Sequence, residues 1–168
     1  MASSKQSLHS PDFPVCLMDY GEVCFYLADV AERGISGTPA NAAGHYTNGI
    51  TASFEYWGAS DVSTYLANPD VAYATAPGDW KVKIGNQLWL AMYNRGFEAW
   101  TAWSVYDTPT FNLPVVSGNH VTTGYTYQIY EQNLNQANRN AASFSIRRHE
   151  QTTTLYFDVN KPKVTIIN

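Results

Sequence analysis

The sequence predicts a mainly α fold built from stacked helical hairpins, followed by an irregular, loop-rich carboxyl-terminal part with short strands. Apolar residues recur at helical spacing through residues 15–105, and short connections containing Gly or Pro separate the helical segments. After residue 105, Pro and Gly interrupt brief apolar runs instead. We therefore expect an irregular arm at 1–14, a helical hairpin region at 15–105, and a loop-rich tail with a short helix and short strands at 106–168, together forming one partial domain.

The first helix is expected at residues 17–33. Its apolar stripe, spaced by three and four residues, consists of Tyr20, Cys24, Leu27, Ala28 and Ala31. The charged residues that we expect mostly on the opposite side are Asp19, Glu22, Asp29 and Arg33. Gly34 is a natural end for this helix, because glycine readily adopts the left-handed conformation that terminates helices.

A second helix should begin after Thr38, which suits the N-cap, with Pro39 at the first helical position, where its missing N–H costs nothing. Gly58 should end it. The residues expected on its buried side are Ala43, Tyr46, Ile50, Phe54 and Trp57. Because only residues 34–37 connect the first two helices, they should pack antiparallel as a hairpin.

A short third helix is expected at 60–67, and the longest helix at 79–103. Two glycines, Gly85 and Gly96, lie within the long helix. Each costs about 1 kcal/mol relative to Ala, which is tolerable where another backbone packs closely. In the tail, residues 106–130 should form a long loop with brief extended pieces. A helical turn is expected at 131–142, and strands are expected at 153–159 and 163–167.

The composition favours a folded protein and disfavours nucleic acid as a partner. Hydrophobic residues make up 45% and charged residues 14%, so disorder is not expected to dominate. The net charge is -4 and no basic run is present, although phosphate binding needs a positive surface. No apolar run approaches the roughly 18 residues of a membrane span. Aromatic residues reach 14%, including 12 Tyr, and some of these rings could be platforms for sugar faces.

The cysteines and histidines give no metal or cofactor motif. If Cys16 and Cys24 lay on one helix, about 12 Å along the axis would separate them, whereas a disulfide needs Cα atoms within roughly 7 Å. We therefore expect free thiols. The four histidines lack metal-binding spacing, and no phosphate-binding loop or nucleophile elbow is present: His9, His45, His120 and His149. We predict no metal and no cofactor.

Acidic residues raise the question of a glycosidase, which holds two carboxyl groups about 5–10 Å apart. The candidates are Glu55, Glu98, Asp107 and Glu131. Glu98 lies beside Phe97 and Trp100, where a structural hydrogen bond or a solvated position is more typical than a general acid. We therefore predict a non-enzymatic protein with no catalytic residues, and glycoside hydrolase remains the weakest alternative.

Five segments together resemble the SusD/RagB family of outer-membrane nutrient-binding lipoproteins, in its carboxyl-terminal region. They are residues 17–34 (LMDYGEVCFYLADVAERG), 45–58 (HYTNGITASFEYWG), 83–100 (KIGNQLWLAMYNRGFEAW), 130–138 (YEQNLNQAN) and 153–158 (TTLYFD). Each motif alone is weak, but their order matches that of the family. Two departures are the absence of paired arginines near Ser104 and Val105, and of an Ile-Pro-x-Arg stretch within 121–130.

The resemblance implies tetratricopeptide-like helical hairpins and a non-catalytic role in capturing oligosaccharides or polysaccharides. It also implies a TonB-dependent, SusC-like transporter as partner, and a lipid-anchored, surface-exposed parent at the outer membrane. The family's signal peptide and lipid-anchored cysteine do not occur in this sequence, which leaves open whether the chain is a piece of a longer protein or a truncated relative of the family. The loop aromatics predicted to contact the ligand are Tyr106, Phe111, Tyr125 and Tyr127. A helical scaffold that binds a protein partner is the main alternative.

Overall fold

The computed structural model describes residues 11, 15–112, 121–145, 153 and 164–165. The chain forms two compact units, residues 1–108 and 109–168. Helices dominate the described residues, which confirms the predicted mainly α fold. Most of the predicted arm at 1–14 lies outside the described residues. Within the described part, no helix is long and apolar enough to cross a membrane.

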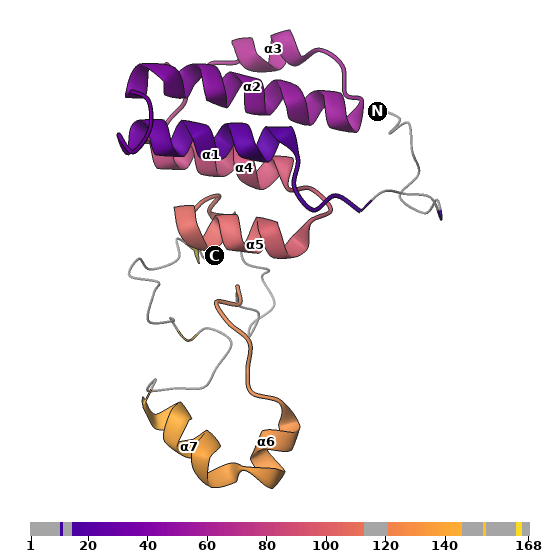
Figure 1. The fold of residues 1–168 in the computed structure, drawn as a ribbon, viewed down its shortest axis with the longest axis vertical. Helices are drawn as coiled ribbons and strands as arrows, with labels where there is room; N and C mark the ends of the chain where they lie inside the picture. The colour runs from indigo at the N-terminus through magenta and orange to yellow at the C-terminus, as the bar shows by residue number, and fades with distance from the viewer. Residues whose placement is uncertain (1–10, 12–14, 113–120, 146–152, 154–163, 166–168) are drawn as a thin grey trace. The chain divides into compact units, whose positions relative to one another are not determined.

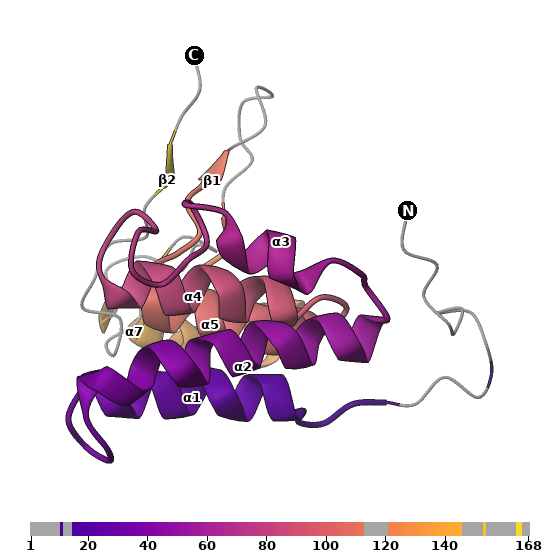
Figure 2. The same cartoon turned by 90° about the horizontal axis from the view of Figure 1, so that it is seen from above.

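The described part of the first unit contains five helices, and the first two form the expected hairpin (Figure 1). α1 packs against both α2 and α4, α3 packs against α2, and α4 packs against α5. Figure 2 shows α1 and α2 running side by side with α4 next to them. The helices are α1 (Tyr20–Glu32), α2 (Pro39–Trp57), α3 (Val62–Ala67), α4 (Trp80–Ala91) and α5 (Gly96–Tyr106).

The predicted ends of α2 are confirmed. Thr38 is the N-cap, and its backbone N–H donates to Asn41 Oδ1 at 3.0 Å. Pro39 occupies the first helical position, where no N–H is required. Gly58 ends the helix in the left-handed conformation, with φ of 63°. Local sequence therefore determines where this helix begins and ends.

The predicted apolar stripe of α1 is partly wrong. Tyr20 and Leu27 are exposed, whereas Phe25, which lies outside the predicted stripe, is fully buried. The reason is that α1 packs against two helices, α2 and α4, so its buried surface is wider and turned relative to a single stripe. Gly49 on α2 makes room for the Phe25 ring, because a Cβ at Gly49 would lie 2.9 Å from it. As expected, Cys24 is buried, and neither cysteine forms a disulfide.

The prediction of one helix at 79–103 is wrong, because the chain turns between α4 and α5. Asn94 adopts the left-handed conformation with φ of 65°, which no α-helix continues through. The Arg95 N–H then donates to the Met92 carbonyl at 2.9 Å, and α5 begins at Gly96. No other element packs closely at Gly96, because a Cβ added there would meet nothing within 4 Å, and this glycine starts α5 and does not lie inside a helix.

At Gly85, in contrast, neighbouring side chains pack closely. A Cβ there would lie 2.6 Å from Tyr106 Cβ and would also overlap the Thr108 side chain. The core of the first unit comes from α1, α2, α4 and α5, together with Val71 and Met92 from connecting segments. It consists of Phe25, Ala28, Tyr46, Ile50, Val71, Ile84, Leu88, Ala91, Met92, Ala102 and Tyr106.

The second unit contains short elements. The helical turn predicted at 131–142 is two helices, α6 (Ile129–Leu134) and α7 (Gln136–Ser145). β1 (Phe111–Asn112) pairs in parallel with β2 (Val164–Thr165), and β2 lies within the strand predicted at 163–167. Of the strand predicted at 153–159, only Thr153 is described, and it belongs to no strand.

Candidate functional site

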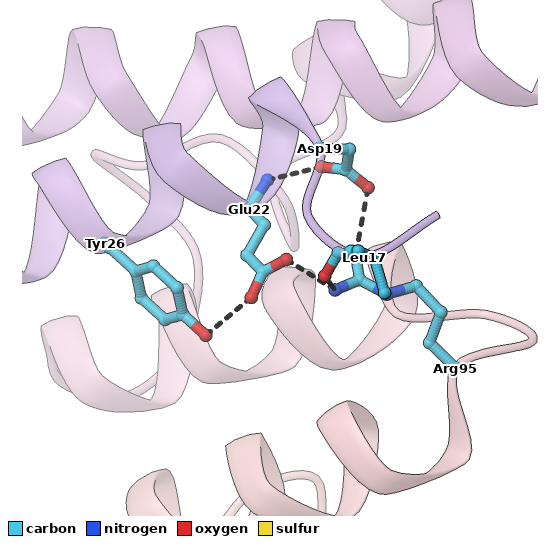
Figure 3. Close-up of polar contacts among 5 residues, drawn as sticks. All are labelled: Leu17, Asp19, Glu22, Tyr26 and Arg95. Atoms are coloured by element: carbon cyan, nitrogen blue, oxygen red, sulfur yellow. Dashed lines mark hydrogen bonds and ion pairs between the residues drawn. The ribbon is translucent and has the colours of Figure 1, made fainter. Parts of the chain in front are cut away.

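A charged network joins the start of α1 to the turn between α4 and α5 (Figure 3). The Arg95 guanidinium donates from Nη2 to Glu22 Oε2 at 2.6 Å and to the Leu17 carbonyl at 3.1 Å. Its Nη1 lies 3.3 Å from Asp19 Oδ2. The Tyr26 hydroxyl donates to the other Glu22 oxygen at 2.9 Å. A single arginine therefore holds two carboxylates and one carbonyl.

Local sequence explains how the two carboxylates come to be near each other. Asp19 is the N-cap of α1, and its Oδ1 accepts the Glu22 N–H at 2.7 Å. An acidic residue three positions after the N-cap is typical of a helix start. The prediction that Glu22 lies on the outer, charged side is wrong, because its side chain is only 6% exposed. Its partner Arg95 is what makes burial of the carboxylate tolerable.

The environment of the network shifts two pKa values upward. Burial lowers the pKa of Arg95, but its hydrogen bond to Glu22 and the charges of Glu22 and Asp19 outweigh this, so the net pKa is raised. Burial and the hydrogen bond to Glu22 raise the pKa of Tyr26 to about 12. Both groups therefore keep their protons at neutral pH, and the network stays intact there.

Beside the network lies a recess of about 190 Å³, which we call the aromatic recess. Three parts of the first unit line it. Cys16 and Asp19 come from the segment that leads into α1, and Tyr56 and Trp57 come from the end of α2. The α4–α5 turn supplies Tyr93, Asn94 and Arg95.

Aromatic rings give the recess its shape. The Trp57 ring meets Tyr56 at 5.1 Å between centroids and 85° between planes, and meets Tyr93 at 5.2 Å and 76°. Such edge-to-face contacts hold the rings in position. Tyr93 nevertheless keeps 62% of its surface exposed. The recess is therefore a fixed aromatic corner that remains open to solvent.

A second hollow of about 240 Å³, the apolar hollow, lies among α2, α3 and α4. Its lining includes Ile50, Phe54, Tyr65 and Leu90, and it shares Trp57 with the aromatic recess. The Tyr65 hydroxyl donates to Gln87 Oε1 at 2.9 Å, so these two polar side chains of the lining are paired with each other. This hollow suits an apolar side chain better than a sugar.

The four aromatic residues predicted as ligand contacts are divided between the two units. Tyr106 ends α5 in the first unit, where it belongs to the core and is 7% exposed, and burial raises its pKa. Phe111 lies in β1 and is half-buried. Tyr125 and Tyr127 precede α6 and are 79% and 43% exposed. Tyr125 and Tyr127 thus have the most surface available for a ligand.

The acidic residues considered for catalysis occupy separate elements. Glu55 is exposed on α2, Glu98 is half-buried in the first turn of α5, and Asp107 follows α5 with φ of 54°. Glu131 on α6 accepts from Asn135 Nδ2 at 2.9 Å. Among the described residues, no group of three or more His, Cys, Asp or Glu side chains is placed to hold a metal ion.

Sequence reasoning does not identify the network or the aromatic recess as sites. The helical spacing places Trp57 in the core, and it places Asn94 and Arg95 inside a continuous helix. The available signal is Asn94-Arg95-Gly96 itself, since Asn tolerates the left-handed conformation and Gly disfavours helix interiors.

Comparisons with known proteins agree with the fold. A family model named SusD-like and described as "Starch-binding associating with outer membrane" matches residues 1–129. A solved structure named "Bacteroidetes AC2a SusD-like" is similar with a TM-score of 0.70 and 25% identity over 85% of this chain. A SusD homolog from Bacteroides uniformis is similar with a TM-score of 0.67 and 24% identity over 88% of this chain.

The match is confined to part of each solved structure. This chain corresponds to 30% of the first structure and 38% of the second, so it spans about a third of their lengths. Among curated proteins, no significant match to the chain was found.

Proposed function

Because the chain belongs to the SusD-like family, described as starch-binding and associating with the outer membrane, we propose that it serves in a non-catalytic, glycan-binding component of an outer-membrane uptake complex. The observation that carries this proposal is the family match across residues 1–129, which includes the whole helical unit. The proposed partner is a TonB-dependent, SusC-like transporter. The proposed location is the cell surface, with a lipid anchor on the full-length protein.

The proposed ligand contacts are Tyr106, at the end of α5, and Phe111, Tyr125 and Tyr127 of the second unit. Exposed rings support the role of the last two, because sugar C–H faces pack on aromatic faces while the phenol keeps a polar handle. Tyr106 is almost fully buried, so it would support the loop that follows it more readily than it would stack on a sugar.

Isothermal titration of the full-length protein with soluble starch and a panel of other polysaccharides tests the proposal. Tyr125→Ala and Tyr127→Ala should each weaken binding roughly two- to tenfold, the effect of losing one stacking contact. Tyr130→Ala is the matched control, because Tyr130 is 68% exposed in the same unit and is not a predicted contact. No binding to any polysaccharide would refute the proposed function.

A protein-binding scaffold is the second candidate, and the apolar hollow favours it. Ile50, Phe54 and Leu90 there could receive an apolar side chain of a partner helix. Leu90→Asp, at an exposed position, should abolish capture of the transporter without changing sugar titration. Unchanged transporter capture would remove the support that the hollow gives to this candidate.

Hydrolysis is the weakest candidate. It would require a carboxyl pair across the bound glycan, and Glu98, which lies beside Phe97 and Trp100 in sequence, is the candidate acid. We expect no release of reducing sugar from any polysaccharide that binds. Release that disappears in Glu98→Gln would overturn the non-enzymatic assignment.

A further inference from the structure

We propose that the aromatic recess binds a single neutral pyranose residue, at a site on the helical unit whose lining includes none of Tyr106, Phe111, Tyr125 and Tyr127. The proposal goes beyond the proposed function, because it adds a second site with its own residues. It rests on the shape of the recess, on unpaired polar groups around it, and on the backbone conformation of Asn94.

The shape suits one sugar ring. Trp57 and Tyr93 stand at 76° to each other, so a pyranose can place its C–H face on one ring and its edge against the other. Pockets for drug-sized ligands typically enclose about 300–1,000 Å³, whereas this recess encloses about 190 Å³. The volume therefore favours one residue at the end of a chain, or a monosaccharide, over an extended oligosaccharide.

Polar groups around the recess are available for sugar hydroxyls. Within the described part of the chain, the Trp57 indole N–H, the Tyr93 hydroxyl and the Asn94 amide make no hydrogen bond. Sugar hydroxyls both donate and accept, so they can satisfy an indole donor, an amide and a phenol together. Groups of this kind, beside aromatic walls, fix the orientation of a ligand in its pocket.

Two features keep this arrangement ready for a ligand. Asn94 holds φ of 65°, an uncommon conformation for a non-glycine residue that places it at the corner of the turn. Asp19 is held by Arg95 and by the Glu22 N–H, while its side chain, which is 19% exposed, lines the recess. The polar side of the recess is therefore positioned before any ligand arrives.

The charges of the lining favour a neutral ligand. Arg95 is already paired with Asp19 and Glu22, and its side chain is only 10% exposed, so it offers little to an anion. An anionic sugar would also face the Asp19 carboxylate. A cation would have to approach the positively charged Arg95 guanidinium. Asp19, the carboxylate in the lining, already accepts from Arg95 and from the Glu22 N–H, so it could not replace the hydration that the cation would lose.

Saturation-transfer NMR and titration of the full-length protein test the site, with methyl glycosides of glucose, galactose, mannose and N-acetylglucosamine as probes. Tyr93→Ala removes an exposed ring. Asn94→Gly removes the amide but keeps the left-handed backbone, since glycine adopts it freely. Each variant should weaken binding of the recognised glycoside roughly two- to tenfold. Tyr20→Ala, at a position 66% exposed on α1, is the matched control and should change nothing.

The outcomes separate this site from the proposed function. Glycoside binding that falls in Tyr93→Ala and Asn94→Gly but persists in Tyr125→Ala supports the recess. Glycoside binding that is unchanged in both recess variants, while their circular dichroism matches the parent, overturns it. The absence of saturation transfer from every glycoside also overturns it, whether or not polysaccharide titration at the loop aromatics succeeds.

Discussion

Replacement of Arg95 by Met removes the cation of the charged network while keeping most of the side-chain volume. Glu22 is left with the Tyr26 hydroxyl as its remaining side-chain partner, and Asp19 keeps only the Glu22 N–H. The carboxylate side chains are 6% and 19% exposed, so neither can recover full hydration. We therefore expect a large loss of stability from this one substitution.

The size of the loss follows from the burial of the pair. Removing one partner of a buried ion pair typically costs about 3–5 kcal/mol, because an uncompensated charge remains. The retained bonds from Tyr26 and the Glu22 N–H place the expected cost near the lower end, at about 3 kcal/mol. For a chain of this length, that corresponds to a decrease in Tm of about 6–12 °C.

Urea unfolding followed by circular dichroism measures this cost. Arg33→Met is the matched control, because the Arg33–Asp29 ion pair, at 2.7 Å, is close in length to the Arg95–Glu22 pair at 2.6 Å, but the Arg33 side chain is 40% exposed. The control should lose only about 1 kcal/mol. The double variant Glu22→Gln/Arg95→Met should be less destabilised than the sum of its single variants by about 1–3 kcal/mol. An Arg95→Met cost no larger than that of the control would refute the reasoning.

Three further predictions concern the same unit. The pKa of Tyr26 is raised from 10.0 to about 12, so the stability that the neutral Tyr26 hydroxyl contributes is complete below pH 10 and is lost as pH rises through about 12. In urea titrations between pH 10 and 12, the free energy of unfolding of Tyr26→Phe should therefore fall less than that of the parent. Gly85→Ala should cost about 1–3 kcal/mol, because the added methyl group overlaps Tyr106. Gly44→Ala, which meets no atom within 4 Å, should instead stabilise α2 by up to about 1 kcal/mol. Equal effects of the two variants in thermal melts would contradict the close packing at Gly85. Asn94→Ala should cost about 1 kcal/mol and Asn94→Gly close to nothing, and a larger cost for Gly would exclude the left-handed turn.

The ends of the first helices can be predicted because capping is local. Thr38, Pro39 and Gly58 act through bonds and conformations within a few residues, and the sequence displays all of them. The mainly α class follows from helical spacing for the same reason. The division between α4 and α5 cannot be predicted in this way, because the apolar spacing continues through Asn94 and only one left-handed residue interrupts it.

The candidate site depends on contacts that spacing does not reveal. Glu22 belongs to the charged side of α1 by its position, and only Arg95, which lies 73 positions away, permits its burial. Trp57 is predicted as a core residue from its place in the α2 stripe, yet it forms the centre of an open aromatic corner. A pattern within one helix cannot show which distant side chain will face it.

The separation between Arg95 and its partners also has a kinetic consequence. The α1–α2 hairpin needs only a short connection, whereas the bonds from Arg95 close loops of 73 to 78 positions. Closing such a loop carries an entropic cost of roughly 4 kcal/mol before the bonds form. We therefore expect the hairpin to form early and the Arg95 bonds to form after the folding transition state. Stopped-flow measurements on Arg95→Met should then show unfolding accelerated roughly a hundredfold and refolding almost unchanged, so that this arginine sets the lifetime of the native state.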